Sequence, residues 1–302
     1  MPEPGPDDLL VRVHAAALNR SDWENLLGRP FYARMQSPVR PNTSILGSDL
    51  AGEVVTTGPN VQQFKVGDRI MADTMYHGAA AFAEYALVRQ GAPVSHVPDG
   101  LTCSQAAALP QAGTIALHAL VGLLQAARVL LMGGGGATGI FFLQLARAAG
   151  ATITAVDSGS KLQFMHDLGA HRVIDYRTTD LTDLSDRFDL ILDPIAALNA
   201  SAARRLLADE GTYLVVGGST RRLLSTLIAG LRSDAGHRQL KVLMVKPGSE
   251  HLQELARQAA DGSLLVPVEA EYALADLPLA LQRLGDGLAQ GRLVIKQHDL
   301  TR

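Results

Sequence analysis

A glycine-rich stretch in the middle of the chain has the residue types and spacing to bind a phosphate group. Residues 128–157 read RVLLMGGGGATGIFFLQLARAAGATITAVD, with four consecutive glycines between an apolar run and a run of helical periodicity. Glycines let a backbone approach an anion closely, and the N-terminus of a following helix offers free N–H groups and partial positive charge. The stretch therefore predicts a site for the pyrophosphate of a dinucleotide.

Two registers of the dinucleotide fingerprint, Gly-x-Gly-x-x-Gly, compete in this stretch. A start at Gly133 puts Thr138 at the third glycine position, whereas a start at Gly134 satisfies the whole pattern. We choose the second register. In it Gly134 makes the tight turn after the strand, Gly136 leaves room for the pyrophosphate, and Gly139 lets the helix pack against the sheet.

The surrounding residues predict the elements that position this site. From Arg128 onward, short aliphatic runs alternate with amphipathic stretches, which predicts βαβ units around a buried parallel sheet. Asp157 ends the second strand of this region, and residues 239–245 (QLKVLMV) predict a sixth strand.

The beginning and the end of the chain have a different pattern. Residues 1 to about 102 contain short strand-like runs among Gly, Pro, Asp and Asn turns, which predicts a mostly antiparallel β-domain. Residues 261–297 return to a strand, a helix and a strand, and we assign them to this first domain. The length of 302 residues also favours two domains.

The composition excludes several classes of protein. With 47% hydrophobic and 19% charged residues the chain is globular, and a net charge of −3 without a basic stripe argues against nucleic acid as a partner. No apolar stretch reaches the roughly 20 residues of a membrane span. The first residues lack the basic and apolar regions of a signal peptide. The lone Cys103 excludes an intrachain disulfide, and together these features predict a cytoplasmic protein.

Several long segments resemble the medium-chain dehydrogenase/reductase superfamily, and within it the zinc-free quinone oxidoreductase branch. They are HAAALNRSDW, LGSDLAGEVVTTGPNVQQFKVGDRI, AAFAEYALV, VPDGLTCSQAAALPQAGTIALHAL, the glycine stretch, LGAHRVIDYR, GTYLVVGG and GRLVI. The resemblance implies an α/β fold in two domains. A GroES-like, mostly antiparallel β-domain (1–102 and 263–302) joins a Rossmann domain with a doubly wound parallel sheet (103–262). The active site is expected in the cleft between them.

The resemblance also bears on metal binding. Where zinc-dependent relatives carry metal ligands, this sequence has Asn19 and Asp49, and it lacks the four-cysteine lobe. These residues do not make a tetrahedral N/S site, and the nine histidines show no ligand spacing. We therefore expect no metal. The absence of a Gly-x-Ser-x-Gly motif argues against a serine hydrolase.

Without zinc, the substrate must accept hydride with less assistance. Quinones and α,β-unsaturated carbonyls (enals) are such acceptors, because the incoming charge delocalises onto an oxygen that a single donor can stabilise. This agrees with the resemblance, which implies NAD(P)H-dependent reduction of these compounds. It also implies a homodimer paired through the edge strand of the Rossmann sheet, here residues 239–245.

Candidate site residues follow from the resemblance. Asn19 is expected to face the nicotinamide, or else to hold a loop. Tyr32 could donate a proton or a hydrogen bond, although a packing role is the favoured alternative. Arg292 matches a basic residue near the cofactor phosphates, with a solvated arginine as the alternative. The other expected cofactor contacts are Thr114, Ala137, Thr138, Asp193, Ile195, Val216, Gly217 and Gly218.

The residues that would choose between NADPH and NADH disagree. Asp157 could accept bonds from the ribose hydroxyls and repel a 2′-phosphate, or turn away to cap the helix beginning near Ser160. Ser158 lies beside it. The NADPH-using relatives bind the 2′-phosphate with a Lys and a Tyr, matched here by Lys161 and Tyr176. We expect NADPH as the main cofactor and NADH as a weaker one.

Two other functions remain open. A nucleotide-binding redox sensor without catalysis is favoured by Ile115, which stands where the family commonly has Thr, and by the absence of the family's usual opening hairpin. An enoyl-thioester reductase would instead turn over crotonyl thioesters. Reduction of a quinone at the expense of NADPH would separate the main function from the sensor.

Overall fold

The computed structural model of the protein describes residues 1–34, 45–78, 80–231, 236–246 and 248–297. Contacts between residues divide the chain into two compact units. The first contains Met1–Arg29, Ala33–Thr114 and Lys246–Arg302, and the second contains Pro30–Tyr32 and Ile115–Val245. Within the described ranges, no helix is long and apolar enough to cross a membrane.

This division differs from the expected one at residues 103–114 and 246–262, which group with the first unit. The reason is packing. Helix α2 (Cys103–Ala108) contacts strands β1 and β2, and helix α8 (Ser249–Ala260) contacts strand β5, all of which belong to the first unit.

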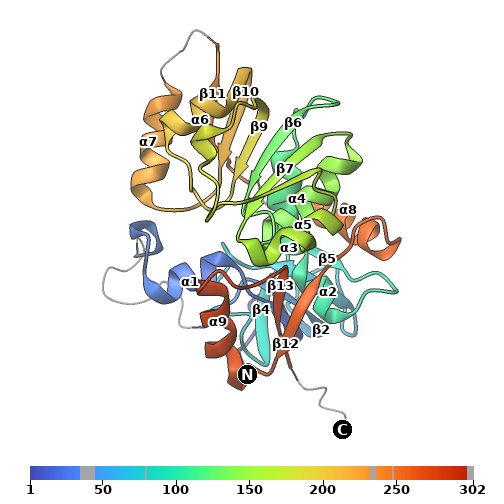
Figure 1. The fold of residues 1–302 in the computed structure, drawn as a ribbon. Coiled ribbons are helices and arrows are strands. Elements are labelled where there is room, and N and C mark those ends of the chain that lie inside the picture. The colour runs from blue at the N-terminus through green and yellow to red at the C-terminus, as the bar shows by residue number, and fades with distance from the viewer. Residues whose placement is uncertain (35–44, 79, 232–235, 247, 298–302) are drawn as a thin grey trace. The chain divides into compact units, whose positions relative to one another are not determined.

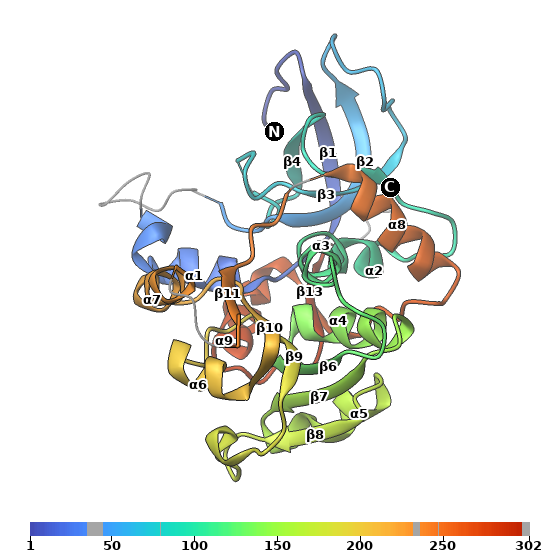
Figure 2. The ribbon, with the colours of Figure 1, turned by 90° about the horizontal axis from the view of Figure 1, so that it is seen from above.

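A seven-stranded sheet forms the centre of the first unit (Figure 2). Its order is β12-β13-β1-β2-β3-β5, and β4 pairs with one end of β1. The pairs are antiparallel except β12–β13, which is parallel. The strands are β1 (Asp8–Ala17), β2 (Asp49–Thr57), β3 (Arg69–Asp73), β4 (Tyr85–Arg89), β5 (Val94–His96), β12 (Val268–Tyr272) and β13 (Arg292–Lys296). The C-terminal strands thus join the N-terminal sheet, as predicted.

Apolar side chains of this sheet build the core of the first unit. Leu9, Val11 and Val13 alternate along β1 and are buried together with Leu50 of β2 and Ile295 of β13. The unit also contains helix α1 (Arg20–Leu27), the 3₁₀ helices η1 (Phe31–Arg34, shared with the second unit) and η4 (Leu274–Asp276), helix α9 (Leu277–Gly285) and the start of helix α3 (Pro110–Ala119).

A parallel six-stranded sheet in the order β11-β10-β9-β6-β7-β8 forms the second unit (Figure 1). The strands are β6 (Arg128–Met132), β7 (Thr152–Asp157), β8 (Arg172–Asp175), β9 (Phe188–Asp193), β10 (Leu207–Val215) and β11 (Gln239–Val242). The connecting helices are α4 (Ala137–Ala148), η2 (Gly159–Lys161), α5 (Leu162–Asp167), η3 (Leu181–Asp183), α6 (Ala200–Leu206) and α7 (Thr220–Gly230). The predicted doubly wound parallel sheet is confirmed.

The strand order places the predicted phosphate site at a topological switch point. From β6 the chain proceeds outward to β7 and β8, and then returns to the other side of β6 as β9. In open α/β sheets ligands bind at the carboxyl ends of the strands where the order reverses. The glycine loop (residues 133–136) follows β6 directly, and Asp157 and Asp193 end β7 and β9.

Strand β11 is shorter than its predicted range of 239–245. It pairs with β10 from Gln239 to Val242, and the last backbone contact is the N–H of Leu243 donating to the carbonyl of Val215 at 2.9 Å. Because β10 ends at Val215, no partner continues the ladder beyond this point.

Candidate functional site

Different glycines of the loop do different work. Gly133 has φ +66°, so it is this residue that makes the left-handed turn after β6, and the expected turn at Gly134 is corrected. Gly134 is instead required by packing, since a Cβ there would lie 2.7 Å from the sulfur of Met165 on α5. A Cβ at Gly139 would lie 2.5 Å from the carbonyl oxygens of Gly133 and Gly134, which explains how closely α4 approaches the loop.

Gly136 is the glycine of this loop that the protein itself constrains least. Its backbone is extended (φ −88°, ψ 178°), which any residue can adopt, and a Cβ would meet only the carbonyl oxygen of Gly133 at 3.3 Å. It is the N-cap of α4 and no side chain caps the helix. The first N–H groups of an α-helix, here at Ala137 and Thr138, have no acceptor within the helix. This end of α4 therefore fits a pyrophosphate.

Asp157 turns toward the glycine loop. Its carboxylate accepts the N–H of Gly135 at 3.0 Å and the N–H of Ser158 at 2.8 Å. The ammonium of Lys161 lies 3.4 Å from the same carboxylate, and both side chains are almost buried. The aliphatic part of Lys161 also lies over Gly135, where a Cβ would come within 2.7 Å of its Cδ. Asp157 is therefore paired with Lys161 and bound to the glycine loop, and it does not cap a helix from Ser160.

Tyr176 follows β8 beside this pair. Its N–H donates to the carbonyl of Asp157 at 3.2 Å, and the two strands pair Asp157 with Asp175. The Tyr176 side chain is half exposed, and the guanidinium of Arg177 lies 5.8 Å from the centre of its ring. The structure thus brings Asp157, Lys161 and Tyr176 together at the ends of β7 and β8.

The ends of β9 and β10 form the other side of the switch point. Asp193 is fully buried, and its carbonyl accepts the N–H of Val216 at 3.1 Å. Gly217 and Gly218 follow with φ of +65° and +93°. Ile195, half exposed, lies against Gly133, since a Cβ at that glycine would be 3.4 Å from its side chain. The predicted residues after β6, β9 and β10 therefore lie at the same edge of the sheet.

In the first unit, Asn19, Ser48, Asp49 and Arg292 form a buried polar cluster. The guanidinium of Arg292 donates to Oδ1 of Asn19 at 2.9 Å and to Oδ2 of Asp49 at 3.2 Å. The amide of Asn19 donates to the hydroxyl of Ser48 at 3.3 Å. Arg292 is fully buried, so it is not a solvated arginine, and its contacts hold the Asn19 side chain in one orientation.

Two carboxyl groups, those of Asp49 and Asp22, interact with this guanidinium, and a third, that of Asp73, lies beside Asp49. Asp49 and Asp73 are directly opposite each other on β2 and β3, and Asp22 on α1 interacts electrostatically with Arg292. Burial raises the pKa of Asp49 well above its usual range, and the neighbouring Asp73 raises it further. Burial also raises the pKa of Asp22 to about 7 and that of Asp73 to about 6. Burial lowers the pKa of Arg292.

Sequence reasoning did not single out the partners of these residues. In the sequence, Asp49 stands out only as a residue unsuited to a zinc site, and Asp73 belongs to no motif. The signal was present in the alternation of β2 and β3, which puts both side chains on one face of the sheet. The pairing of Asp49 with Arg292 had no local signal, because it depends on β13 joining the N-terminal sheet.

The remaining predicted residues lie as follows. Thr114 is buried on α3, next to Ile115. Tyr32 belongs to η1, and its side chain lies outside the described part of the structure. Among the residues that are described, no group of three or more His, Cys, Asp or Glu side chains is arranged to hold a metal ion.

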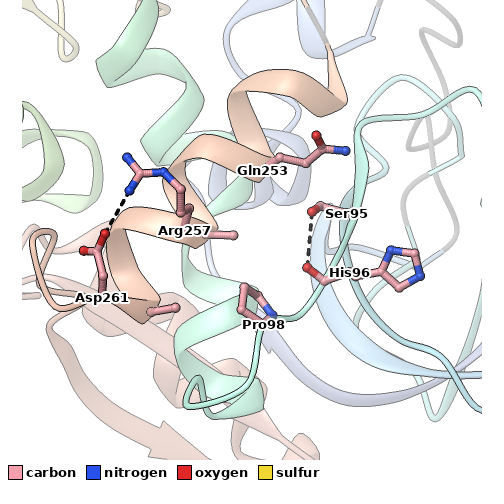
Figure 3. A pocket seen from close by; sticks show the side chains of 8 residues that line it. Ser95, His96, Pro98, Gln253, Arg257 and Asp261 are labelled. Atoms are coloured by element: carbon pink, nitrogen blue, oxygen red, sulfur yellow. Dashed lines mark hydrogen bonds and ion pairs between the residues drawn. The ribbon is translucent and has the colours of Figure 1, made fainter.

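A groove of about 590 Å³ in the first unit contains none of the predicted residues (Figure 3). It lies between β5 and α8, and Figure 3 shows Ser95, His96 and Pro98 on one side and Gln253, Arg257 and Asp261 on the other. The guanidinium of Arg257 is engaged by Asp261 at 2.9 Å and by Glu254 at 2.7 Å. The charged side chains of Arg257 and Asp261 are therefore already paired with each other.

Comparison with known proteins identifies the family. The alcohol dehydrogenase GroES-like domain matches residues 5–99, and the zinc-binding dehydrogenase family matches residues 168–295. The mitochondrial NAD(P)H oxidoreductase RTN4IP1 of Danio rerio is 31% identical over 96% of this chain and 84% of its own length. The chloroplast envelope quinone oxidoreductase homolog of Arabidopsis thaliana is 27% identical over 98% of this chain and 92% of its own.

A solved structure has the same fold over nearly the whole chain. The quinone oxidoreductase from Coxiella burnetii superimposes with a TM-score of 0.88 and 27% identity, covering 98% of this chain and 92% of that one. The parallel sheet with its glycine loop, the antiparallel sheet with its C-terminal strands and these matches agree. The chain belongs to the medium-chain dehydrogenase/reductase superfamily, in its quinone oxidoreductase-like branch.

Proposed function

We propose that this protein is a zinc-independent NAD(P)H-dependent oxidoreductase that transfers hydride to a quinone or an α,β-unsaturated carbonyl. The observation that carries the proposal is the uncrowded backbone of Gly136 at the uncapped start of α4, beside the switch point of the parallel sheet. Two of the relatives named above are a quinone oxidoreductase and a quinone oxidoreductase homolog, and a third is an NAD(P)H oxidoreductase.

Each group of residues has a separate task in this proposal. The loop at Gly136 and the first N–H groups of α4 hold the pyrophosphate, while Lys161 and Tyr176 hold a 2′-phosphate. When bound, the nicotinamide supplies the hydride. Asn19, oriented by Arg292, presents its side chain to the reacting groups. Tyr32 is proposed as a second donor. Arg292 orients Asn19 rather than touching the phosphates.

Steady-state loss of NADPH absorbance tests this function directly. Purified protein with 9,10-phenanthrenequinone or an enal should oxidise NADPH at a rate proportional to enzyme concentration. Cofactor binding without turnover of any quinone or enal would overturn the proposal in favour of a redox sensor, the alternative that Ile115 supports. Turnover confined to crotonyl thioesters would identify an enoyl-thioester reductase instead.

Lys161→Ala should change the choice of cofactor. The buried ammonium of Lys161 is the group nearest to Asp157 that can neutralise it, and its loss leaves a carboxylate facing the 2′-phosphate. We expect NADPH binding to weaken by roughly tenfold or more, about 1.4 kcal/mol, with NADH nearly unchanged. Titration of both cofactors by calorimetry measures this, with Lys65→Ala, which changes an exposed lysine of the first unit, as the control. Equal losses for both cofactors, or a wild-type preference for NADH, would assign the specificity to Asp157.

Activity should not depend on zinc. Since Asn19 and Asp49 are both engaged by Arg292, neither is available as a metal ligand without breaking a buried contact. Elemental analysis should give far less than one zinc per chain, and quinone reduction should survive EDTA. Stoichiometric zinc that is required for turnover would contradict the mechanism.

A homodimer is proposed through β11, the edge strand of the parallel sheet. Beside it, α7 exposes Leu224, Leu227 and Ile228, whose spacing puts them on one face. Light scattering at micromolar concentration should give twice the mass of 32.0 kDa. Leu227→Asp should give monomers, whereas the same change at exposed Leu124 should not. A monomeric wild type would refute the pairing.

We propose the cytoplasm as the location, although two relatives are named for the chloroplast envelope and mitochondria.

A further inference from the structure

The carboxylate of Asp193 organises the loop that follows β9. It accepts the N–H of Ile195 at 3.3 Å, of Ala197 at 3.1 Å and of Leu198 at 2.9 Å. A carboxylate that accepts several backbone N–H groups fixes the path of the chain around it, as in an Asx-turn. Residues 194–198 are therefore folded around a single side chain.

One more donor reaches this carboxylate from the neighbouring strand. The hydroxyl of Tyr213 on β10 donates to Oδ2 of Asp193 at 2.9 Å and also approaches the carbonyl of Leu198 at 3.4 Å. The Tyr213 side chain is fully buried. Burial and the Asp193 carboxylate raise the pKa of its hydroxyl, so that it stays protonated and remains a donor. Tyr213 thus links the loop that follows β9 to the neighbouring strand β10.

The loop held in this way has a conformation that it would not adopt unaided. Ala196 has φ +52°, a left-handed conformation that costs a non-glycine residue on the order of 1 kcal/mol or more. Its Cβ occupies the place where a side chain at Gly218 would project, so a larger residue at Gly218 would collide with it. The contacts to Asp193 offset the cost of this conformation.

The conformation of this loop determines where the Ile195 side chain lies. With the N–H groups of Ala197 and Leu198 bound by the Asp193 carboxylate, the Ile195 side chain is half exposed and lies against Gly133 at the start of the glycine loop. It is the apolar side chain that links the end of β9 to the end of β6, across the switch point. A shift of the loop would move it relative to Gly133.

We infer that Tyr213 is a positioning residue for the dinucleotide site, acting through Asp193 to hold Ile195 as one wall of that site. This inference rests on the proposed function. It assigns Tyr213 no contact with substrate or cofactor. The wall meets a part of the dinucleotide that NADPH and NADH share, so the effect of Tyr213 is the same for both. Lys161, by contrast, acts on NADPH alone.

Tyr213→Phe tests the inference by removing only the hydroxyl. We expect the dissociation constants of NADPH and NADH to rise by about the same factor, roughly tenfold, since a hydrogen bond to a charged group is lost. The turnover number at saturating cofactor should change less than about twofold, because the reacting groups are untouched. Amide hydrogen exchange of residues 195–198 in the cofactor-free protein should accelerate, while exchange in β7 should not.

Two further variants separate positioning from general destabilisation. Thr226→Val removes another buried hydroxyl of the same unit, on α7, and should leave both dissociation constants unchanged. Ile195→Ala alters only a half-exposed side chain and should weaken both cofactors as Tyr213→Phe does. Wild-type affinity in Tyr213→Phe, or a loss for NADPH alone, overturns the inference. A wild-type protein that binds neither dinucleotide overturns the proposed function itself, which is a different result.

Discussion

Gly136→Val should abolish dinucleotide binding while leaving the protein folded. The backbone of Gly136 has φ and ψ that valine can adopt, and the nearest atom to its Cβ would be the carbonyl oxygen of Gly133 at 3.3 Å. The side chain would instead fill the space of a pyrophosphate oxygen. We expect the affinity for NADPH to fall at least about 100-fold, roughly 2.7 kcal/mol, measured by calorimetry.

The neighbouring glycines make this a discriminating experiment. Valine at Gly135 would collide with Lys161, and valine at Gly139 would collide with the carbonyls of the loop, so those variants report on folding. Gly91→Val is the matched control, because a Cβ there has no neighbour within 4 Å and its φ is not left-handed. Wild-type affinity in a folded Gly136→Val protein would show that the chosen register of the fingerprint is wrong.

Compared with wild type, the Asp22→Asn protein should become more stable as the pH rises. Asp22 is almost fully buried, and burial raises its pKa to about 7. Between about pH 4 and pH 7 the native state therefore keeps a proton on Asp22 that the unfolded chain has already released. The contribution of Asp22 to the free energy of unfolding is complete below about pH 4 and is lost as the pH rises to 7. Asparagine, which resembles the protonated acid, does not incur this loss.

The expected size of this effect follows from the same shift. Between pH 5 and pH 8, the free energy of unfolding of Asp22→Asn relative to wild type should rise on the order of 2 to 3 kcal/mol. Urea unfolding followed by circular dichroism at both pH values measures it. Asp99→Asn, which removes an exposed carboxylate, is the control. A difference that is the same at pH 5 and pH 8 would show that Asp22 is ionised throughout, held by the N–H groups of Asn19 and Gly47.

The alternation of strands and helices was sufficient to predict the parallel sheet, and the strand signals near the end of the chain correctly assigned residues 261–297 to the first sheet. Hydrophobic periodicity depends on neighbours in sequence, which is why it succeeded. The individual roles of the four glycines were not predictable from it. Periodicity does not distinguish one glycine from the next, and what separates Gly134 from Gly136 is whether the fold brings a side chain such as Met165 against it.

The polar contacts of the site were harder to predict for a related reason. Arg292 was expected at the phosphates or in solvent, yet it is buried against Asn19 and Asp49, which lie at the other end of the sequence. Tyr213 was overlooked because a tyrosine in a buried strand is indistinguishable from a core residue until its hydroxyl is seen to reach Asp193. Such contacts depend on strand order, and strand order is not encoded locally.

The position of β13 has a consequence for how this protein is made on the ribosome. This strand is synthesised long after β1, yet the two strands pair in the first sheet. All strands of the parallel sheet lie between Arg128 and Val242, so this sheet can form while the nascent chain is still attached. The sheet of the first unit, in contrast, cannot be completed before β13 is available. Until β13 is clear of the ribosome, Asp49 lacks the Arg292 guanidinium and residues Ala15–Ala17 of β1 lack their partner strand on one side. A ribosome stalled before β13 should therefore carry a folded second unit and an N-terminal segment that binds chaperones.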